Sequence, residues 1–395
     1  MPTSISIGFS QKANPQEAAF DACVQAKHHL ESHQTDLAIL FTSIHYAQTE
    51  TLDVIASVLK PKHLVGCSSG GIIAPDGVFR RGIGILTITS DDLRYGTAAI
   101  NNIGSLNLRE AGFEFARKLT QDLNFPQRSG CLMFSDILFK NNSQFVRGAQ
   151  EVLGSGFPII GAISSDDFRF KKTYQYHQEK VLTNTAVGVL LGGDIAIALG
   201  SQHGWKPLGK PRYLTQVQEH VIRTIDHKPA VHIYEEFLGA EAVQLQKGVL
   251  NSYAILYPLG IYLENEKQYL LRNAVDILPD GSIVCQGEIP EGAEVHLMIG
   301  NKDACRQAAI GAAQEVKDAL GGRQAKALLI IESLARHKIL GRSSFSEIQA
   351  IKDVLGYTTP LIGMYSYGEI GPFGSLDNIK STHLHNENIM IVAIN

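Results

Sequence analysis

Two hydrophobic patterns alternate along the chain. Short apolar runs of strand length, such as Leu37–Phe41, are followed by stretches in which apolar residues recur every three or four positions, such as Leu52, Ile55 and Leu59. The first pattern predicts buried β-strands, and the second predicts amphipathic helices. The longest stretches of the second kind predict helices over Pro15–Leu30, Leu108–Leu123 and Lys302–Leu320.

One short motif occurs three times. Two apolar residues precede a glycine and a serine follows three positions later, at Gly66 and Ser69, Gly161 and Ser164, and Gly363 and Ser366. A strand pattern and a helix pattern precede each copy, and a further apolar run follows it, at Ile83–Ile88, Ala186–Leu191 and Ile389–Ile394. The chain is therefore predicted to repeat a unit of helix, strand, helix, strand, loop and strand, so that segments 36–89, 130–191 and 326–394 should superpose.

The repeated unit predicts mixed sheets flanked by helices, an architecture between the α/β and α+β classes. Strands joined by a helix normally run parallel, so their carboxyl ends share one edge of the sheet. We expect the glycine–serine motifs to form turns just past those ends, where ligands bind in open α/β sheets. The strand after each motif should return antiparallel.

Residues from about 195 to 300 break this pattern. The elements predicted there are a hairpin, a further strand and a helix, at Tyr269–Ile277 with Ile283–Gln286, Glu294–Ile299 and Pro229–Leu238. We place the boundary between two packed domains near Gly204. The first domain, 1–203, would hold two copies of the unit, and the second, 204–395, would hold the inserted strands and the third copy.

Composition narrows the function classes. The 395 residues carry 35 Lys plus Arg against 39 Asp plus Glu, a net charge of −4, so nucleic acid is not expected as a partner. No apolar run reaches the roughly 20 residues of a membrane span, and no signal peptide is evident, so neither membrane insertion nor secretion is expected. The five cysteines are an odd number without a CxxC motif, which favours a reducing, cytoplasmic location.

The first motif, Gly66-Cys-Ser-Ser-Gly-Gly, carries the most reactive side chain. Its backbone N–H groups and hydroxyls could line a ligand, Cys67 could act as a nucleophile, or the segment could be a tight structural turn. A nucleophilic Cys67 would need a cationic neighbour such as His63 or His45 to lower its pKa.

The other two motifs combine acidic, basic and aromatic side chains. In Ser164-Ser-Asp-Asp-Phe-Arg, the arginine could bind a ligand carboxylate or pair with its own aspartates. In Tyr365-Ser-Tyr-Gly-Glu, the residues could hold an amine, or Glu369 could cap backbone N–H groups. The 14 histidines show no zinc-binding spacing, so no metal site is predicted. Haem stays possible because an axial ligand needs only one His or Cys.

Taken together, these segments resemble FIST-domain proteins, with an N-terminal and a C-terminal FIST domain over nearly the whole chain. The N-terminal likeness lies in Leu37-Ala-Ile-Leu-Phe-Thr-Ser, Val65-Gly-Cys-Ser-Ser-Gly and Ile160-Gly-Ala-Ile-Ser-Ser-Asp-Asp-Phe-Arg-Phe. The C-terminal likeness lies in Gly204-Trp-Lys-Pro-Leu-Gly, Tyr257-Pro-Leu-Gly, Gly363-Met-Tyr-Ser-Tyr-Gly-Glu-Ile-Gly-Pro and Leu384-His-Asn.

The resemblance implies a sensory module of bacterial and archaeal signalling, with amino acids proposed as ligands. Some members of the family bind haem, sense nitric oxide and act on histidine kinases. This chain departs from the family pattern at Gly71, where a glutamate is common, and at Leu334, where a cysteine is common. Chemistry that needs either side chain is therefore in doubt.

From these observations we expect a cytoplasmic sensor of a small ligand, without catalytic activity, that signals to a separate partner such as a histidine kinase. The alternatives are a haem-binding nitric oxide sensor and an enzyme that uses Cys67. The expected ligand-binding residues are Cys67, Ser68, Ser69, Ser164, Asp166, Arg169, Arg336, Tyr367, Glu369 and His385. Arg169 and Arg336 would hold a carboxylate, Glu369 an ammonium group, and the serines would orient the ligand.

Overall fold

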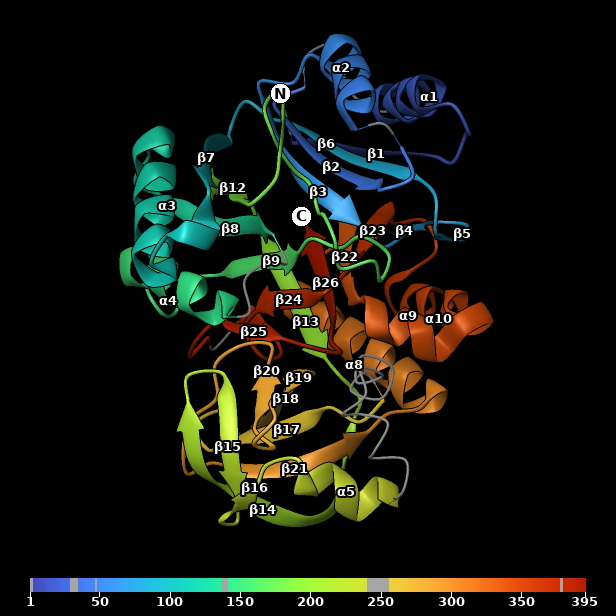
Figure 1. Ribbon diagram of the computed structural model, residues 1–395. Helices are drawn as coiled ribbons and strands as arrows, with labels where there is room; N and C mark the ends of the chain where they lie inside the picture. The colour runs from blue at the N-terminus through green and yellow to red at the C-terminus, as the bar shows by residue number, and fades with distance from the viewer. Residues whose placement is uncertain (1–2, 29–34, 47, 137–140, 240–255, 377–378) are drawn as a thin grey trace.

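The computed structural model describes residues 3–28, 35–46, 48–136, 141–239, 256–376 and 379–395. Their strands form three six-stranded sheets and a fourth, inserted sheet. Figure 1 shows the three sheets together at the centre, helices on the outside, and the inserted sheet at one end. The mixed α/β architecture with two domains confirms the predicted fold class.

The first sheet has the order β1-β6-β2-β3-β10-β11. Its strands are β1 (Ser4–Ser10), β6 (Ile83–Thr89), β2 (Leu37–Ser43), β3 (His63–Ser69), β10 (Gln175–His177) and β11 (Lys180–Leu182). The parallel pair β2 and β3 is joined by α2 (Gln48–Leu59), and α1 (Pro15–His28) joins β1 to β2. The last two positions of the predicted helix Pro15–Leu30 lie outside the described residues.

The second sheet has the order β7-β12-β8-β9-β24-β25 when read from β7. Its strands are β7 (Arg94–Asn101), β12 (Thr185–Gly192), β8 (Arg128–Ser135), β9 (Ile159–Ile163), β24 (Gly368–Gly371) and β25 (His383–His385). The helices α3 (Leu108–Leu123) and α4 (Asn142–Leu153) pack against each other. Helix α3 has the predicted bounds because Asn107 caps its first N–H groups and Asn124 ends it in the left-handed region.

The third sheet has the order β13-β26-β22-β23-β4-β5. Its strands are β13 (Ile197–Gln202), β26 (Ile389–Ile394), β22 (Ala327–Ser333), β23 (Leu361–Ser366), β4 (Ile72–Ala74) and β5 (Gly77–Phe79). Its helices are α8 (Lys302–Leu320), α9 (Leu334–Leu340) and α10 (Phe345–Leu355). The crossover between β22 and β23 is two helices, not the single one predicted, because the chain turns at Gly341, whose φ is 56°.

The three sheets share one strand order, and each is completed by a hairpin from elsewhere in the chain. The β4–β5 hairpin follows β3 in sequence but pairs with β23. In the same way, β10–β11 follows β9 but pairs with β3, and β24–β25 follows β23 but pairs with β9. The exchange runs in a cycle and brings the carboxyl ends of β3, β9 and β23 into one region.

The motif glycines lie inside these strands, which corrects the expectation that they form turns beyond them. Gly66 pairs with Leu40 in β2, and Gly161 pairs with Met133 in β8. A Cβ atom would lie 1.9 Å from the Leu40 carbonyl oxygen at the first position and 2.0 Å from that of Met133 at the second. The glycines are therefore needed for close strand approach, and only the following serines stand at the strand ends.

The inserted sheet lies between β13 and α8 in the chain, with the order β18-β17-β21-β14-β15-β20-β19 and β16 beside β15. Its strands are β14 (Lys206–Gln218), β15 (Val221–Ile225), β16 (Lys228–Pro229), β17 (Leu259–Leu263), β18 (Gln268–Arg272), β19 (Ala274–Ile277), β20 (Ile283–Cys285) and β21 (Glu294–Ile299). The predicted hairpin forms between β19 and β20. Helix α5 (His232–Leu238) starts later than predicted because Pro229 pairs with Thr224.

Apolar strand faces from all three main sheets meet in a shared core. Phe41 and Phe134 pack edge to face with ring centroids 5.6 Å apart, and Ile331 of the third sheet belongs to the same buried cluster. Strand β13 precedes the expected boundary at Gly204 but pairs with β26 near the other end of the chain. Among the described helices, none has the length and apolarity that crossing a bilayer requires.

Candidate functional site

The serines at the strand ends form buried contacts between units. Ser68 Oγ accepts a hydrogen bond from Tyr174 N at 3.0 Å and donates one to the Ser165 carbonyl oxygen at 3.0 Å. Ser69 Oγ accepts one from Tyr365 N, also at 3.0 Å. Both serines are fully buried. The side chains of both serines therefore join the three repeated units by bonding to backbone groups of the other units. The sequence analysis had instead suggested that these serines lie in loops open to a ligand.

Cys67 and Ser164 are also fully buried. The Cys67 Sγ lies 3.7 Å from the Met364 Sδ, and burial raises the pKa of the thiol far above its usual value. Ser164 Oγ accepts a hydrogen bond from Gln175 Nε2 at 3.0 Å. Cys67 is thus a protonated core residue, which is a poor nucleophile.

Asp166 connects the N-terminal half to the third unit. Its carboxylate accepts hydrogen bonds from the N–H groups of residues 170, 171 and 172, at 2.9, 2.8 and 3.0 Å. It also accepts one from the Tyr367 hydroxyl at 2.6 Å. The structure therefore brings together two residues that the sequence analysis had assigned to one site. Arg169 is exposed. Asp167, one of the two aspartates with which Arg169 could have paired, forms an ion pair with Arg80.

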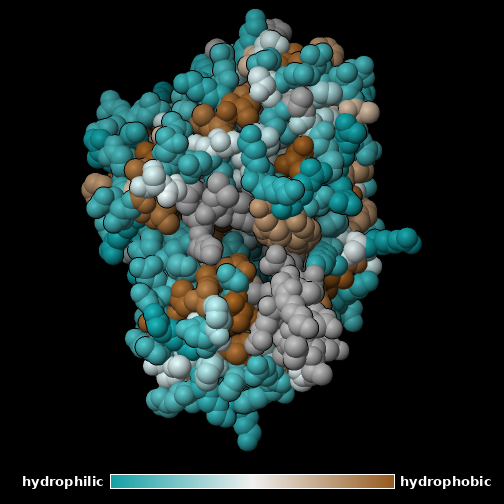
Figure 2. Space-filling view, in the orientation of Figure 1, coloured by the Kyte–Doolittle hydropathy of each residue, from teal (hydrophilic) through white to brown (hydrophobic). Residues whose placement is uncertain are grey.

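A small cavity of about 50 Å³ lies beside this contact. Three segments meet around it: the loop after Asp166, the edge of the inserted sheet, and the carboxyl ends of β22 and β23. Its lining residues are Phe168, Phe170, Asn273, Ala274, Val275, Gln286, Ser333, Leu334, Ala335, Ser366 and Tyr367. One water needs about 10–15 Å³ of such space, so the cavity has room for a small polar group or a few waters. Figure 2 shows apolar residues exposed on the face where the inserted sheet meets the main body.

Glu369 lies directly behind the cavity. The Ser366 hydroxyl donates to its Oε1 at 2.5 Å, and Asn388 N donates to its Oε2 at 3.1 Å. Complete burial raises the pKa of Glu369 to about 8, against the opposing effect of these two hydrogen bonds. Because Ser366 also lines the cavity, its hydroxyl links the cavity to a carboxyl group that is mostly protonated near neutral pH.

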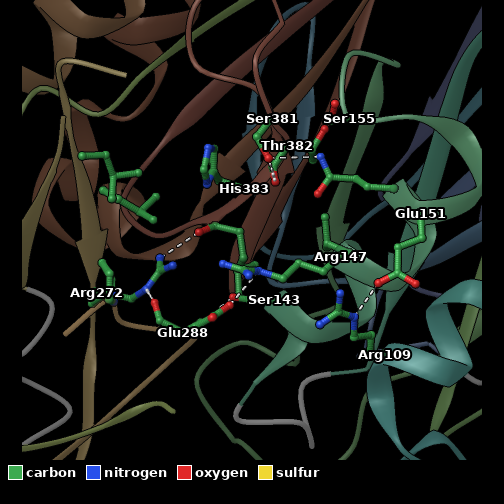
Figure 3. A pocket seen from close by; sticks show the side chains of 16 residues that line it. Arg109, Ser143, Arg147, Glu151, Ser155, Arg272, Glu288, Ser381, Thr382 and His383 are labelled. Carbon is green, nitrogen blue, oxygen red and sulfur yellow. Dashed lines mark hydrogen bonds and ion pairs between the residues drawn. The ribbon is translucent and has the colours of Figure 1, made fainter. Parts of the chain in front are cut away.

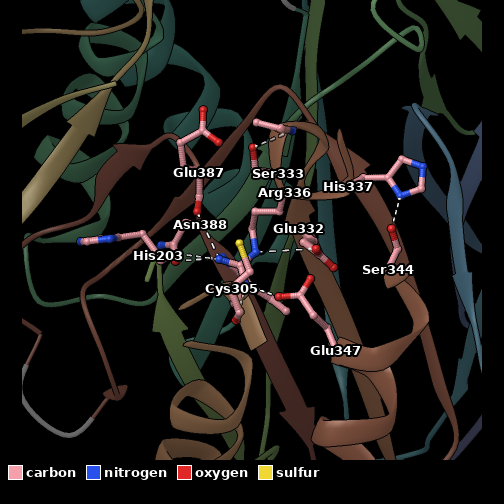
Figure 4. Close-up of polar contacts among 12 residues, drawn as sticks. His203, Cys305, Glu332, Ser333, Arg336, His337, Ser344, Glu347, Glu387 and Asn388 are labelled. Atoms are coloured by element: carbon pink, nitrogen blue, oxygen red, sulfur yellow. Dashed lines mark hydrogen bonds and ion pairs between the residues drawn. The ribbon is translucent and has the colours of Figure 1, made fainter. Parts of the chain in front are cut away.

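Arg336 does not face the cavity. Figure 4 shows its guanidinium group surrounded by its own protein partners. It forms a close ion pair with Glu347, lies 3.6 Å from a Glu332 oxygen, and donates to the His203 carbonyl oxygen at 2.6 Å. It is fully buried. The structure thus supports the alternative that Arg336 braces its surroundings, and it offers no carboxylate clamp formed by Arg169 and Arg336.

Two buried carboxylates beside Arg336 were missed from the sequence. The side chains of Glu332 and Glu387 are fully buried, and this burial raises the pKa of both groups well above the usual value. Glu387 also has a φ of 61°, in the left-handed region that side chains avoid. For Glu387, the signal available in the sequence was the polar run His385-Asn-Glu-Asn, which immediately precedes strand β26.

The sequence analysis left haem open as an alternative, and His385 is one histidine that could bind it. Its Nε2 lies 2.9 Å from the Gly371 carbonyl oxygen, and burial lowers its pKa well below the usual value. Haem requires an apolar slot beside a free axial ligand. Among the cavity walls of the described residues, His383 lines a polar groove with three arginines and is paired with Glu266. His385 and His383 are therefore both engaged with protein groups, and none of the His, Cys, Asp and Glu described gathers in a metal-binding group.

The Asp166–Tyr367 contact predicts a measurable loss of stability. Tyr367→Phe keeps the ring stacked on Phe170, with centroids 4.6 Å apart, but removes a hydrogen bond to a buried carboxylate. We expect the free energy of unfolding to fall by about 1.5–3 kcal/mol in urea titration. The control is Tyr357→Phe, which removes an equivalent Tyr–Asp bond at an exposed position and should change little. Equal losses in both variants would contradict the role given to Asp166.

These features define a two-domain α/β protein with a small cavity where its domains meet. Residues 36–228 match the FIST N domain and residues 230–372 match the FIST C domain. The chain therefore belongs to the FIST-domain family, as its motifs had indicated. FIST domains are generally sensory domains that bind ligands.

The chain is similar to proteins that are themselves uncharacterised. One from Mycobacterium tuberculosis is 24% identical over 384 residues, which cover 93% of this chain and 94% of that protein. One from Methanocaldococcus jannaschii is 23% identical over 313 residues, which cover 75% of this chain and 58% of that protein. Among solved structures, cyanuric acid hydrolase from A. caulinodans covers 99% of both chains, with a TM-score of 0.42 and 9% identity. A similarity this remote carries no inference about activity.

Proposed function

We propose that the protein is a cytoplasmic sensor that binds a small ligand in the cavity beside Tyr367 and has no catalytic activity of its own. The observation that carries this proposal is the position of the cavity. Its walls come from the loop at Phe168, the inserted sheet at Asn273 and the strand ends at Ser366. A ligand that contacts all three segments would favour one relative arrangement of them, which a separate signalling protein could detect.

The cavity walls favour a ligand that carries a protonated amine. Aromatic rings at Phe168, Phe170 and Tyr367 can face a cation, and Ser366 Oγ can accept a hydrogen bond from the amine while its own proton goes to Glu369. At the rim, the Lys338 Nζ lies 5.4 Å from the centre of the Phe168 ring and could pair with a carboxylate. An amino acid or a similar small polar metabolite has both groups, and its amine end is of a size that the cavity of about 50 Å³ can hold. The partner would be a histidine kinase or another signalling protein.

The environment of Cys67 supports a role without catalysis. A nucleophilic cysteine needs a lowered pKa and access to substrate, whereas Cys67 is fully buried and its thiol pKa is raised. The shared strand order of the three main sheets also supports our view that the chain repeats one structural unit. Such a repeat would place equivalent strand ends around one region, which suits a binding site formed jointly.

The test is calorimetric titration with the proteinogenic amino acids, together with mass spectrometry of compounds that co-purify. We expect one of them to bind, and Ser366→Ala to weaken that binding about tenfold or more, about 1.4 kcal/mol, because the cavity loses its polar link to Glu369. Ser57→Ala, on an exposed helix position, is the matched control. Unchanged affinity in Ser366→Ala, a haem absorption band in the purified protein, or turnover that requires Cys67 would each overturn the proposal.

A further inference from the structure

A second, larger hollow is lined by Arg272, the residue before Asn273, which lines the cavity. Figure 3 shows this groove, of about 610 Å³, between helix α4, the inserted sheet and strand β25. Ser143, Arg147 and Gln150 contribute one face of α4, and Arg272 ends strand β18 on the facing wall. Neither the family nor the sequence analysis had assigned a role to this groove.

Two of the three arginines in the groove are already neutralised. Arg109 forms an ion pair with Glu151, and Arg147 forms one with Glu288 across 2.8 Å. Both arginines are exposed at the rim. The lining contains three arginines and two glutamates, so one arginine is left without a glutamate partner.

Arg272 is that remaining cation, and it is only 2% exposed. Its Nε donates to the Glu288 carbonyl oxygen at 3.0 Å, and its Nη1 donates to those of Leu271 and Leu384 at 3.0 and 2.8 Å. No carboxylate among the described residues lies within ion-pair distance of it. A guanidinium group has five N–H donors, so the two on Nη2 have no described acceptor.

A buried arginine without a counterion is costly, because removing a charge from water must be offset by a partner. Burial lowers the pKa of Arg272 to about 10, against the opposing effect of Glu288, whose carboxylate is beyond ion-pair distance; Arg272 is therefore still charged at neutral pH. The three carbonyl oxygens hold the guanidinium in a fixed orientation but supply no negative charge. The missing component is an anion with oxygen acceptors.

We propose that this groove is a binding site for a small oxyanion, the carboxylate or phosphoryl group of a metabolite, with Arg272 as the residue that receives its charge. The fixed Nη2 donors would bind one oxygen atom or two. The polar side chains of Gln150 and Ser381, which are hydrogen-bonded to each other at 3.2 Å, line the same groove and can turn toward the ligand. The proposal does not depend on what binds in the cavity at Tyr367.

The test is calorimetric titration of the full chain with inorganic phosphate and, separately, with succinate. We expect at least one of the two to bind saturably, at one site per chain; phosphate alone would identify a phosphoryl site, and succinate alone a carboxylate site. Arg272→Lys keeps a positive charge but loses the paired Nη2 donors, so binding should weaken about tenfold or more.

Arg147→Gln keeps the test decisive if the Arg272 variant does not fold. It frees Glu288 to place a negative charge in the groove, so we expect binding to weaken several-fold. Arg117→Gln is the control, because Arg117 pairs with Glu114 on the exposed face of α3. The proposal fails if neither anion binds, or if Arg147→Gln and a folded Arg272→Lys bind as tightly as Arg117→Gln.

Discussion

Arg336→Met should lower the free energy of unfolding by about 3–5 kcal/mol, because it removes the positive charge that pairs with the buried Glu332 and Glu347. Methionine keeps much of the volume of the arginine stem. The variant therefore isolates the charge of Arg336 and its hydrogen bonds to the carbonyl oxygens of His203 and Cys305, at 2.6 and 2.8 Å. The shift of the urea unfolding midpoint gives the loss directly.

The loss in Arg336→Met should also depend on pH. Without the arginine, the buried Glu332 is neutralised only by protonation, so the deficit should shrink as the solution becomes acidic. Arg117→Met, at an exposed ion pair, is the control and should change stability by less than about 1 kcal/mol. A fully stable Arg336→Met variant would contradict the role given to the charge of Arg336.

Glu369→Gln should make the protein less sensitive to alkaline pH. The folded-state pKa of Glu369, about 8, lies above the value of 4.5 for an unperturbed glutamate. The folded protein therefore binds more protons than the unfolded chain between these values. The stabilisation is complete below about 4.5 and is lost as the pH rises through 8, with a slope of about 1 kcal/mol per pH unit.

Glutamine resembles the protonated carboxyl group and can keep its contacts. Its amide can donate to Ser366 Oγ, whose proton has another acceptor in the Glu332 carbonyl oxygen at 3.2 Å. We expect melting temperatures measured from pH 5 to 9 to fall less steeply in Glu369→Gln than in the wild type. Glu151→Gln, at an exposed ion pair, should leave the slope unchanged. Parallel profiles for the wild type and Glu369→Gln would show that Glu369 is ionised in the folded protein throughout this range.

The helices and strands that hydrophobic periodicity predicted correctly are those whose bounds are set by neighbouring residues in the sequence. Helix α8 has the predicted bounds, Lys302–Leu320, because its apolar face repeats regularly, Asn301 caps its start and Gly321 ends it. Strand β21 also has the predicted bounds, Glu294–Ile299. In contrast, the partners of the short strand Ile72–Ala74 could not be predicted, because three apolar residues fit the edge of any sheet.

The candidate site was predictable only in part, for the same reason. Asp166 and Tyr367 were assigned to one site because they lie in equivalent loops of the repeated unit, and they are in contact. Arg336 was read as a ligand clamp because its buried partner Glu347 lies on a different helix. Asn273 was missed because it lay inside the predicted strand Tyr269–Ile277, where a single polar residue looks like an ordinary surface position. Its place at the cavity comes from tertiary packing alone.

The cyclic exchange of hairpins makes the order of synthesis matter for folding. The first sheet lacks its β10–β11 edge until the second unit has left the ribosome, and the second sheet lacks β24 until nearly the whole chain has done so. The β4–β5 hairpin is made early, yet its partner β23 comes almost last. Contacts between such distant positions fold slowly and leave unpaired strand edges exposed in the meantime. Nascent chains of this protein should therefore depend on chaperones during synthesis, although the folded protein has paired these strand edges.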